Sequence, residues 1–339
     1  MTPYKKPKLN TIHYDHTVKG LPELSNITVA ITGTTSGTGF VAALTMAKKG
    51  ARVICLNRPS KRAKIALNAI TEASQNDVIG IDCDLQSFES VREAANMITR
   101  YCPNGLNILC NNAGVMALKD TATPDGFDIQ MQVNHLSHFL LTKKLFPLLD
   151  AASKKVGEAR IVNHSSIARF GAKILEAKYL EKRGGHLGGN GTGMMIFPGG
   201  RWVRYAQTKL ANCAFTSALH AMLMASKSSV KAMVAHPGLS VTDLQSTTVS
   251  DGGMGQLFTS LLMRGGQTQW DGALGIITAM AEPTLSSGSF IGPGAGKWAL
   301  KGAPIRFELE PFYNNNETMN MMWEKSCEAI GESFTIGSA

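Results

Sequence analysis

The sequence predicts an α/β fold, a single doubly wound domain in which helices cover both faces of a parallel sheet of about seven strands. The main observation is that short β-branched runs alternate with longer amphipathic stretches along the chain, the pattern of successive strand–helix–strand units. With 339 residues, of which 44% are hydrophobic, the chain can also bury a large core. No repeat or linker divides it, so one domain is expected.

The elements follow in order from this alternation. A helical pattern over residues 40–49 is closed by Gly50, and another covers residues 87–101. Similar patterns lie between most of the predicted strands. The predicted strands are residues 27–31, 52–56, 78–82, 106–110, 160–163, 230–235 and 289–291.

The domain is expected over residues 26–330, between an N-terminal arm (1–25) and a C-terminal tail (331–339). One segment interrupts its pattern: GGHLGGNGTGMMIFPGG, residues 184–200, is low in complexity and rich in glycine. Because the α/β pattern resumes after it, this segment is predicted to be an inserted loop and not a domain boundary.

Composition excludes several classes of protein. The net charge is +9, but the basic residues are dispersed, which argues against nucleic acid as a partner. No apolar stretch approaches the roughly 20 residues of a membrane span, and the start MTPYKKPKLN has no apolar signal-peptide core. The six cysteines are scattered, which fits a reducing compartment. We therefore expect a cytoplasmic protein, with an organelle location after signal removal left open.

The stretch TGTTSGTGF, residues 32–40, places three glycines where the first predicted strand becomes a helix. Gly33, Gly37 and Gly39 lack the Cβ atoms that would block a pyrophosphate, and the N-terminus of the following helix attracts an anion. The alternative is a loop that needs glycine only for a tight turn.

Polar clusters also follow the other early strands. They are Asn57-Arg58, Asp84-Leu85 and Asn111-Asn112-Ala113-Gly114. Ligands of doubly wound sheets bind beyond the carboxyl ends of the strands. Any one cluster could be a turn or a cap, but four in order along one edge predict a dinucleotide site.

Tyr205 and Lys209 stand four residues apart in a helical pattern and are therefore stacked on one face. A neighbouring ammonium and an oxidised nicotinamide both favour the phenolate, so Tyr205 can exchange a proton with an alcohol or carbonyl while hydride moves to or from the nicotinamide. Ser166 would hold the substrate oxygen. The alternative readings are a surface Tyr–Lys pair and a serine that caps a helix.

These motifs resemble the short-chain dehydrogenase/reductase family in its usual order: TGTTSGTG, NNAG, the Ser165-Ser166 pair, YAQTK at 205–209 and HPG at 236–238. The resemblance covers about residues 26–330. RYAQTKLAN, HPGLSVTDL, GGQTQWDGALGIITAM and SGSFIGPG are most similar to the branch of retinol dehydrogenase and WW-domain oxidoreductase, with protochlorophyllide reductase more distant. One departure is Thr38, which stands where many members have Ile or Leu.

The resemblance implies a Rossmann-type domain and assigns the site residues. It implies a catalytic set of Asn134, Ser166, Tyr205 and Lys209, in which Asn134 anchors a water relay to Lys209. The alternative for Asn134 is an asparagine that bonds only to the backbone. It places Asp84 beside the adenine and Asn112 beside the adjoining ribose. The expected cofactor-binding residues are Gly33, Thr35, Ser36, Gly37, Thr38, Gly39, Arg58, Asp84, Leu85, Asn112, Ala113, Gly114, Tyr205, Lys209, Pro237, Gly238 and Thr242. His135, His138 and His164 lack metal-ligand spacing and are expected to be polar core or rim residues, so no metal site is predicted.

The end of the second strand predicts NADP(H) and not NAD(H). An acidic residue there would bind the ribose 2′-hydroxyl, whereas this chain has Arg58, with Lys61 and Arg62 close behind. Arginine can hold a phosphate through two parallel hydrogen bonds. The alternative is a solvated basic helix start.

A lipophilic alcohol or carbonyl substrate is expected because residues 244–263 are mainly apolar and small and because methionines, such as Met254 and Met263, adapt to irregular apolar ligands. One alternative is a protochlorophyllide-type reductase, although Ala211 stands where that type has cysteine. Another is a catalytically silent NADP(H)-binding regulator.

The loop at 184–200 is predicted to be a mobile flap that closes Met194, Met195, Ile196 and Phe197 over the substrate. Its alternatives are a surface excursion or a contact in a homo-oligomer, which the sequence leaves open.

Overall fold

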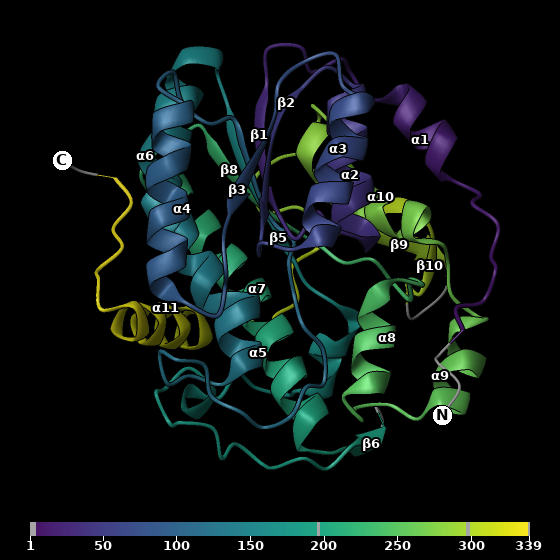
Figure 1. Cartoon of the computed structure of the whole chain (residues 1–339). Coiled ribbons are helices and arrows are strands. Elements are labelled where there is room, and N and C mark those ends of the chain that lie inside the picture. Colours follow the sequence, from purple (N-terminus) through teal and green to yellow (C-terminus); the bar gives the residue numbers. More distant parts are fainter. Residues whose placement is uncertain (1–4, 195–196, 296–298, 338–339) are drawn as a thin grey trace.

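The computed structural model describes residues 5–194, 197–295 and 299–337, and it contains an eight-stranded sheet (Figure 1). The strand order is β10-β9-β8-β5-β4-β1-β2-β3. All neighbours pair in parallel except β10, which runs antiparallel to β9. The predicted Rossmann-type α/β class is confirmed. The strands of this sheet are β1 Thr28–Thr32, β2 Arg52–Asn57, β3 Val78–Asp82, β4 Ile108–Asn111, β5 Ala159–His164, β8 Val230–Ala235, β9 Phe290–Ala295 and β10 Lys301–Phe307.

All seven predicted strands are present, and the eighth, β10, is the difference from the prediction. This edge strand contains Pro304, has a register irregularity, and has no buried residue. A strand of this kind lacks the continuous apolar run that identified the others, and proline in a sheet is confined to edges or bulges. Its pairing with β9 gives it a place in the sheet.

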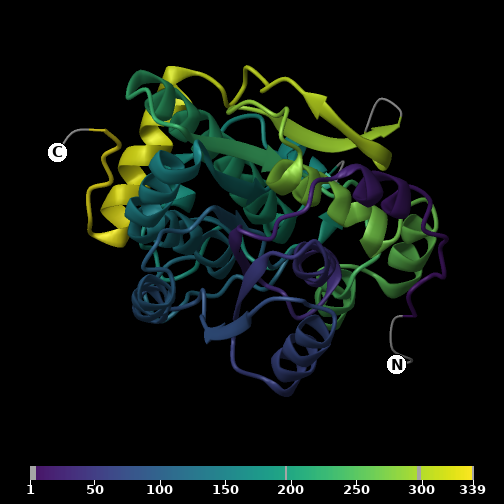
Figure 2. The same ribbon diagram turned by 90° about the horizontal axis from the view of Figure 1, so that it is seen from above.

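Helices cover both faces of the sheet (Figures 1 and 2). On one face lie α4, α6 and α7, with α11 packed against α7; on the other, α2 packs against α10. The α-helices are α1 Tyr14–Gly20, α2 Gly37–Lys48, α3 Lys61–Glu72, α4 Phe88–Tyr101, α5 Ile129–Met131, α6 Ser137–Val156, α7 Gly200–Ala225, α8 Asp243–Ser250, α9 Gln256–Met263, α10 Gln269–Ala281 and α11 Asn316–Ile330. A two-stranded hairpin, β6 Gly193–Met194 and β7 Phe197–Pro198, precedes α7.

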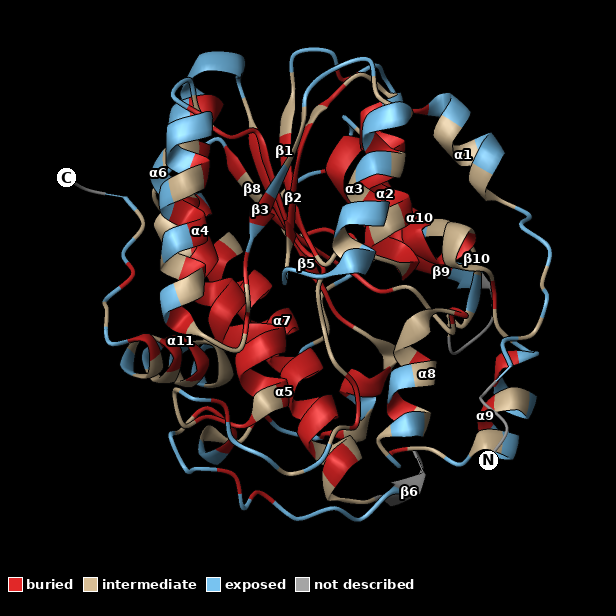
Figure 3. Ribbon diagram, viewed as in Figure 1, coloured by how far each residue is buried: buried red, intermediate tan, exposed pale blue. Residues whose placement is uncertain are grey.

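Two apolar cores lie on opposite sides of the sheet, and Figure 3 shows the buried strands and inner helix faces in red. The chain beyond residue 330 contributes to one of them. Phe334 is buried and stacks on Trp323, while Glu332 forms an ion pair with Arg92. The residues predicted to form a C-terminal tail therefore begin as part of the domain.

The N-terminal arm lies along the surface of the domain. The backbone N–H groups of Ile12, His13 and Tyr14 donate to the carboxylate of Asp271, the third residue of α10. Leu21 and Leu24 are buried in the core beside α2. In the part of the chain that the structure describes, no helix is both long enough and apolar enough to cross a membrane.

Candidate active site

Tyr205 and Lys209 lie on α7 with their side chains buried, one turn apart as the sequence predicts. The Lys209 ammonium donates to the carbonyl oxygen of His164 at 3.0 Å. Its Nζ lies 5.7 Å from the centre of the Tyr205 ring. The end of β5 therefore fixes the ammonium beside the phenol.

Ser166 follows the end of β5 and caps the short 3₁₀ helix Ile167–Gly171, accepting from Ala168 N at 3.1 Å. The serine side chain also hydrogen-bonds to Tyr205. Burial raises the pKa of Tyr205 to about 12, and this hydrogen bond partly opposes the rise. The structure thus brings Ser166, Tyr205 and Lys209 together.

Asn134 lies in a π-helical turn, Gln132–Leu136, which leads into α6. Its Oδ1 accepts from Val115 N at 2.7 Å, and its Nδ2 donates to Val115 O and to Thr208 Oγ1. A Cβ atom added to Gly114 would lie 3.2 Å from Asn134 Oδ1 and 3.5 Å from Lys209 Nζ. Asn134 and Lys209 therefore border the same space, and a water relay between them stays a prediction.

The charge at this site is concentrated on Lys209. Burial lowers its pKa to about 8, so the ammonium persists at neutral pH. Burial and the nearby Lys209 lower the pKa of His164 to about 3 and that of His138 to about 4, so both rings are neutral. These two and His135 are buried, which confirms that all three histidines are polar core residues.

The glycine-rich turn between β1 and α2 is tightly constrained. Gly33 and Gly37 have φ values of +73° and +61°, in the region that favours glycine. A Cβ on Gly39 would lie 2.2 Å from Asn112 Nδ2 and 2.2 Å from Gly33 O. The fold itself thus requires glycine at these positions, in addition to the predicted need for space around an anion. A Cβ atom added to Gly37 would lie 3.3 Å from the side chain of Thr242.

This turn fits the phosphates of a dinucleotide. Ser36, the N-cap residue of α2, makes no capping hydrogen bond, and the first turn of the helix has no acidic residue. The amides of that turn therefore remain available to an anion at the positive end of the helix. Thr35 and Ser36 are half-buried beside them, whereas the Thr38 hydroxyl donates to Asn112.

Asn112 serves mainly to hold the turn. Its Nδ2 donates to Thr32 O and Gly33 O, and its Oδ1 accepts from the hydroxyl of Thr38 and contacts His164 Nδ1 at 3.0 Å. Because its amide group is already bonded within the protein, contact with a ribose stays a prediction. Ala113 and Gly114, which follow it, are half-buried.

The remaining predicted cofactor residues lie just beyond the carboxyl ends of their strands. Arg58 is exposed after β2, and its neighbour Asn57 holds the glycine-rich turn by bonding to Thr34. After β3, Leu85 is buried and Asp84 accepts from Gln86 N at 3.0 Å.

Three more predicted residues follow β8. Pro237 and Gly238 are half-buried, and Gly238 has a φ of +62°. Thr242 begins α8 in a capping box with Gln245. These residues therefore lie at the carboxyl ends of the strands, the edge at which doubly wound sheets bind their ligands.

An apolar cluster separate from the two large cores surrounds Tyr205. Met116, Ala117 and Ala168 pack with Tyr205, and Trp202, Leu244 and Met254 pack against them. The ring centre of Trp202 lies 5.9 Å from that of Tyr205, nearly perpendicular to it. The sequence pointed to the segment containing Leu244 and Met254 but missed Met116 and Trp202, for which no local pattern gave a signal.

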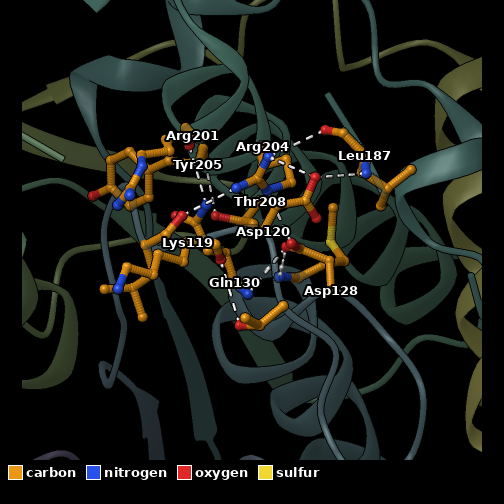
Figure 4. Close-up of polar contacts among 12 residues, drawn as sticks. Lys119, Asp120, Asp128, Gln130, Leu187, Arg201, Arg204, Tyr205 and Thr208 are labelled. Carbon is orange, nitrogen blue, oxygen red and sulfur yellow. Dashed lines mark hydrogen bonds and ion pairs between the residues drawn. The ribbon is translucent and has the colours of Figure 1, made fainter. Parts of the chain in front are cut away.

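The same end of α7 carries two buried arginines that the sequence analysis also missed (Figure 4). Arg204 has no exposed surface and lies 3.0 Å from Asp128 and 3.5 Å from Asp120. It donates to the carbonyl oxygens of Leu118, Leu187 and Gly189.

Arg201 donates to the carboxylate of Asp251 at 2.7 Å and to the carbonyl oxygen of Ala117. It therefore ties the segment after α8 to the apolar cluster beside Tyr205.

These contacts also hold the first part of the inserted loop. Asp120 accepts from the backbone N–H groups of Leu187 and Gly189, and it donates its own N–H to Asn190. Because residues 187–191 are held by buried side chains, the predicted flap is limited to the hairpin of β6 and β7 that follows. Of the residues predicted to close over the substrate, Met195 and Ile196 lie outside the described residues, and the side chains of Met194 and Phe197 are not described.

Comparisons with known proteins agree with this geometry. Residues 27–180 match the family model of short chain dehydrogenases. The chain is 30% identical over 319 residues to human (Homo sapiens) polyprenol dehydrogenase, covering 89% of this chain and 84% of that protein. The chain belongs to the short-chain dehydrogenase family. Within the family it is related to the retinol dehydrogenase branch, with 30% identity over 306 residues to retinol dehydrogenase 12 of Bos taurus, covering 89% and 86% of the two chains.

A solved structure has a similar architecture. It is an uncharacterized protein from Mycobacterium Paratuberculosis, with a TM-score of 0.70 and 28% identity, covering 94% of this chain and 98% of that one. Membership of this family makes the chain an oxidoreductase of alcohol or carbonyl groups that uses a nicotinamide cofactor.

Proposed function

We propose that this enzyme interconverts a lipophilic alcohol with its aldehyde or ketone, using NADP(H). The observation that carries the proposal is that the half-buried Ser166 lies with the buried Tyr205 and Lys209 beside an apolar cluster. When bound, the dinucleotide would supply the hydride or accept it.

Tyr205 would move the proton at the substrate oxygen. Its raised pKa keeps the phenol protonated at neutral pH, ready to donate to a carbonyl that is being reduced. In the oxidation direction the phenol must accept a proton, and the Lys209 ammonium on the same helix face favours its anionic form. Ser166, already bonded to Tyr205, would position the substrate oxygen between the two hydroxyl groups.

The lipophilic nature of the substrate is supported by the side chains near Tyr205. Met116, Trp202 and Met254 offer apolar surface and no charge. The two relatives described above are named for polyprenol and retinol, both of which are apolar alcohols. Burial of a hydrocarbon chain against such side chains stabilises binding roughly in proportion to the apolar area removed from water.

The function is tested by measuring NADPH oxidation with aldehydes and ketones of increasing chain length. Activity should rise with chain length, and Tyr205→Phe should lower kcat by about 10²–10⁴-fold while NADPH binding changes little. Tyr179→Phe, a change at another buried tyrosine, is the matched control and should keep the wild-type rate. If Tyr205→Phe kept more than about a tenth of that rate, its role as acid and base would be wrong. NADPH binding without turnover of any compound would favour a silent regulator.

The preference for NADP(H) is supported by Arg58, which is exposed beyond β2 with the exposed Lys61 and Arg62 at the start of α3. Arg58→Asp should weaken NADPH binding by about tenfold or more, because a charge-assisted contact is lost and a repulsive one gained. NADH binding should change little. Lys64→Asp, one turn further along α3, is the control for net charge. Equal losses for both cofactors would show that Arg58 does not contact the 2′-phosphate.

We also propose a cytoplasmic location. The described chain has six free cysteines, five of them buried, as is usual where thiols stay reduced. Immunofluorescence of the full chain tests this, and staining confined to an organelle would contradict it.

A further inference from the structure

The helix α9 has an unusual outward face. It buries only Thr259 and Met263, one turn apart, against the domain. On the other side, Leu257 is 88% exposed and Leu261 69% exposed, and Phe258 and Leu262 are also exposed. A surface helix normally turns polar residues to water. Figure 3 shows exposed surface along α9, which stands at the edge of the molecule beside α8.

Basic residues flank this face. No acidic residue stands between Asp251 and Asp271, and the exposed Arg264 directly follows α9. The N-terminal arm, with exposed Lys5 and Lys8, passes beside α9 in both Figure 1 and Figure 2.

Two side-chain contacts hold the arm in this place. Lys6 pairs with Asp243 at the start of α8, and Thr11 bonds to Thr268 just before α10. These two contacts hold the segment with the exposed Lys5 and Lys8 in the part of the arm that passes beside α9, while the charge of Lys6 is paired with Asp243.

We propose that α9 docks on an anionic lipid surface. Its leucines and Phe258 would enter the boundary between headgroups and acyl chains, while Lys5, Lys8 and Arg264 lie at the level of the headgroups. A helix of eight residues is far shorter than the roughly 20 residues needed to span a bilayer, so it would lie in the plane of the interface.

A second copy of the chain is a weaker occupant for this surface. Stable dimers bury about 800 Å² from each partner, more than four side chains on a two-turn helix offer. The clustered positive charge would also face itself across a two-fold axis. A lipid surface with negative headgroups satisfies the apolar and the basic residues together.

The position of α9 would bring the catalytic end of the protein to the membrane. It begins two residues after Met254, which packs in the apolar cluster beside Tyr205. Docking uses none of the catalytic residues, so it can be tested separately from the proposed reaction.

The test is co-sedimentation of the full chain with vesicles of phosphatidylcholine alone or mixed with phosphatidylserine. The protein should pellet with the mixed vesicles and remain largely in the supernatant with phosphatidylcholine alone. Leu257→Ser/Leu261→Ser should weaken binding by about tenfold or more, because two of the inserting side chains are lost. The matched control is Val156→Ser/Met224→Ser, which alters exposed apolar residues at the ends of α6 and α7.

A charge variant tests the second half of the proposal. Lys5→Gln/Lys8→Gln/Arg264→Gln should abolish most of the preference for phosphatidylserine, since each basic residue near an anionic surface contributes about a fivefold gain in binding. Thermal unfolding and NADPH binding of every variant should match the wild type.

Three outcomes would overturn the proposal. They are wild-type protein that does not pellet with either vesicle, equal binding by Leu257→Ser/Leu261→Ser and its control, and a wild-type dimer in light scattering that this double variant dissociates.

Discussion

Replacing Arg204 by methionine should lower the free energy of unfolding more than replacing any exposed arginine does. The side chain has no exposed surface and holds two carboxylates and three carbonyl oxygens (Figure 4). Methionine keeps much of the apolar volume and removes every one of these contacts. A buried carboxylate left without its partner typically destabilises a fold by about 3–5 kcal/mol.

The structure allows this magnitude to be built from its parts. Three lost hydrogen bonds to carbonyl oxygens contribute about 1 kcal/mol each. Asp128 adds a pH-dependent part: burial raises its pKa to about 6, and Arg204 opposes that rise. Without Arg204 the pKa rises further, so at pH 7 the variant loses about another 1.4 kcal/mol for the one pH unit above 6. The expected total is about 4 kcal/mol at pH 7.

The stability difference between Arg204→Met and wild type should increase with pH. Because the folded pKa of Asp128 lies above its ordinary value, the folded state binds the proton more tightly than the unfolded chain, and ionisation of Asp128 opposes folding as pH rises. Below pH 6 Asp128 is protonated in both folded proteins, so the gap between Arg204→Met and wild type should be near 3 kcal/mol, from the carbonyl contacts. Above pH 6 the gap should widen.

Urea unfolding at pH 5, 6, 7 and 8 measures this gap. The control is Arg183→Met, which removes an exposed ion pair with Glu181 and should change stability by less than about 1 kcal/mol at each pH. A loss for Arg204→Met no larger than that of the control, or a loss that does not vary between pH 5 and 8, would refute the reasoning.

Two further predictions concern the site. Lys209→Met should abolish turnover yet stabilise the folded protein at pH 7, by up to about 3 kcal/mol, because burial lowers the Lys209 pKa from 10.5 to about 8. That penalty on the folded state is full below pH 8 and fades as pH rises toward 10.5. The difference in melting temperature between the variant and wild type should therefore be smaller at pH 10 than at pH 7. A variant less stable than wild type at pH 7 would contradict this reasoning. In the absence of ligand, Gly39→Ala should destabilise the protein more than Gly37→Ala, because the Cβ at position 39 would collide with the backbone. Gly37→Ala adds about 1–2 kcal/mol of strain from the left-handed backbone conformation and should chiefly weaken NADPH binding. Equal melting temperatures for the two glycine variants would argue against this reading of the turn.

The sequence alone determined the features that rest on local periodicity. Parallel strands read as short apolar, β-branched runs, and all seven were predicted from the chain, including β3, of which only Ile81 is buried. The pairing of Tyr205 with Lys209 follows from the helical repeat, and the glycine-rich turn follows from the need for backbone without side chains. Each of these is set by residues within a few positions of one another.

Only the tertiary structure decided the contacts between distant segments. The edge strand β10 depends on pairing with β9, and Phe334 depends on the aromatic side chains it meets in the core. Nothing near Arg204 in the chain indicates that Asp120 and Asp128 are its partners or that it holds the inserted loop. The physical reason is that a charged side chain can be buried only where the whole fold brings opposite charges and carbonyl oxygens to it, and that arrangement has no local pattern.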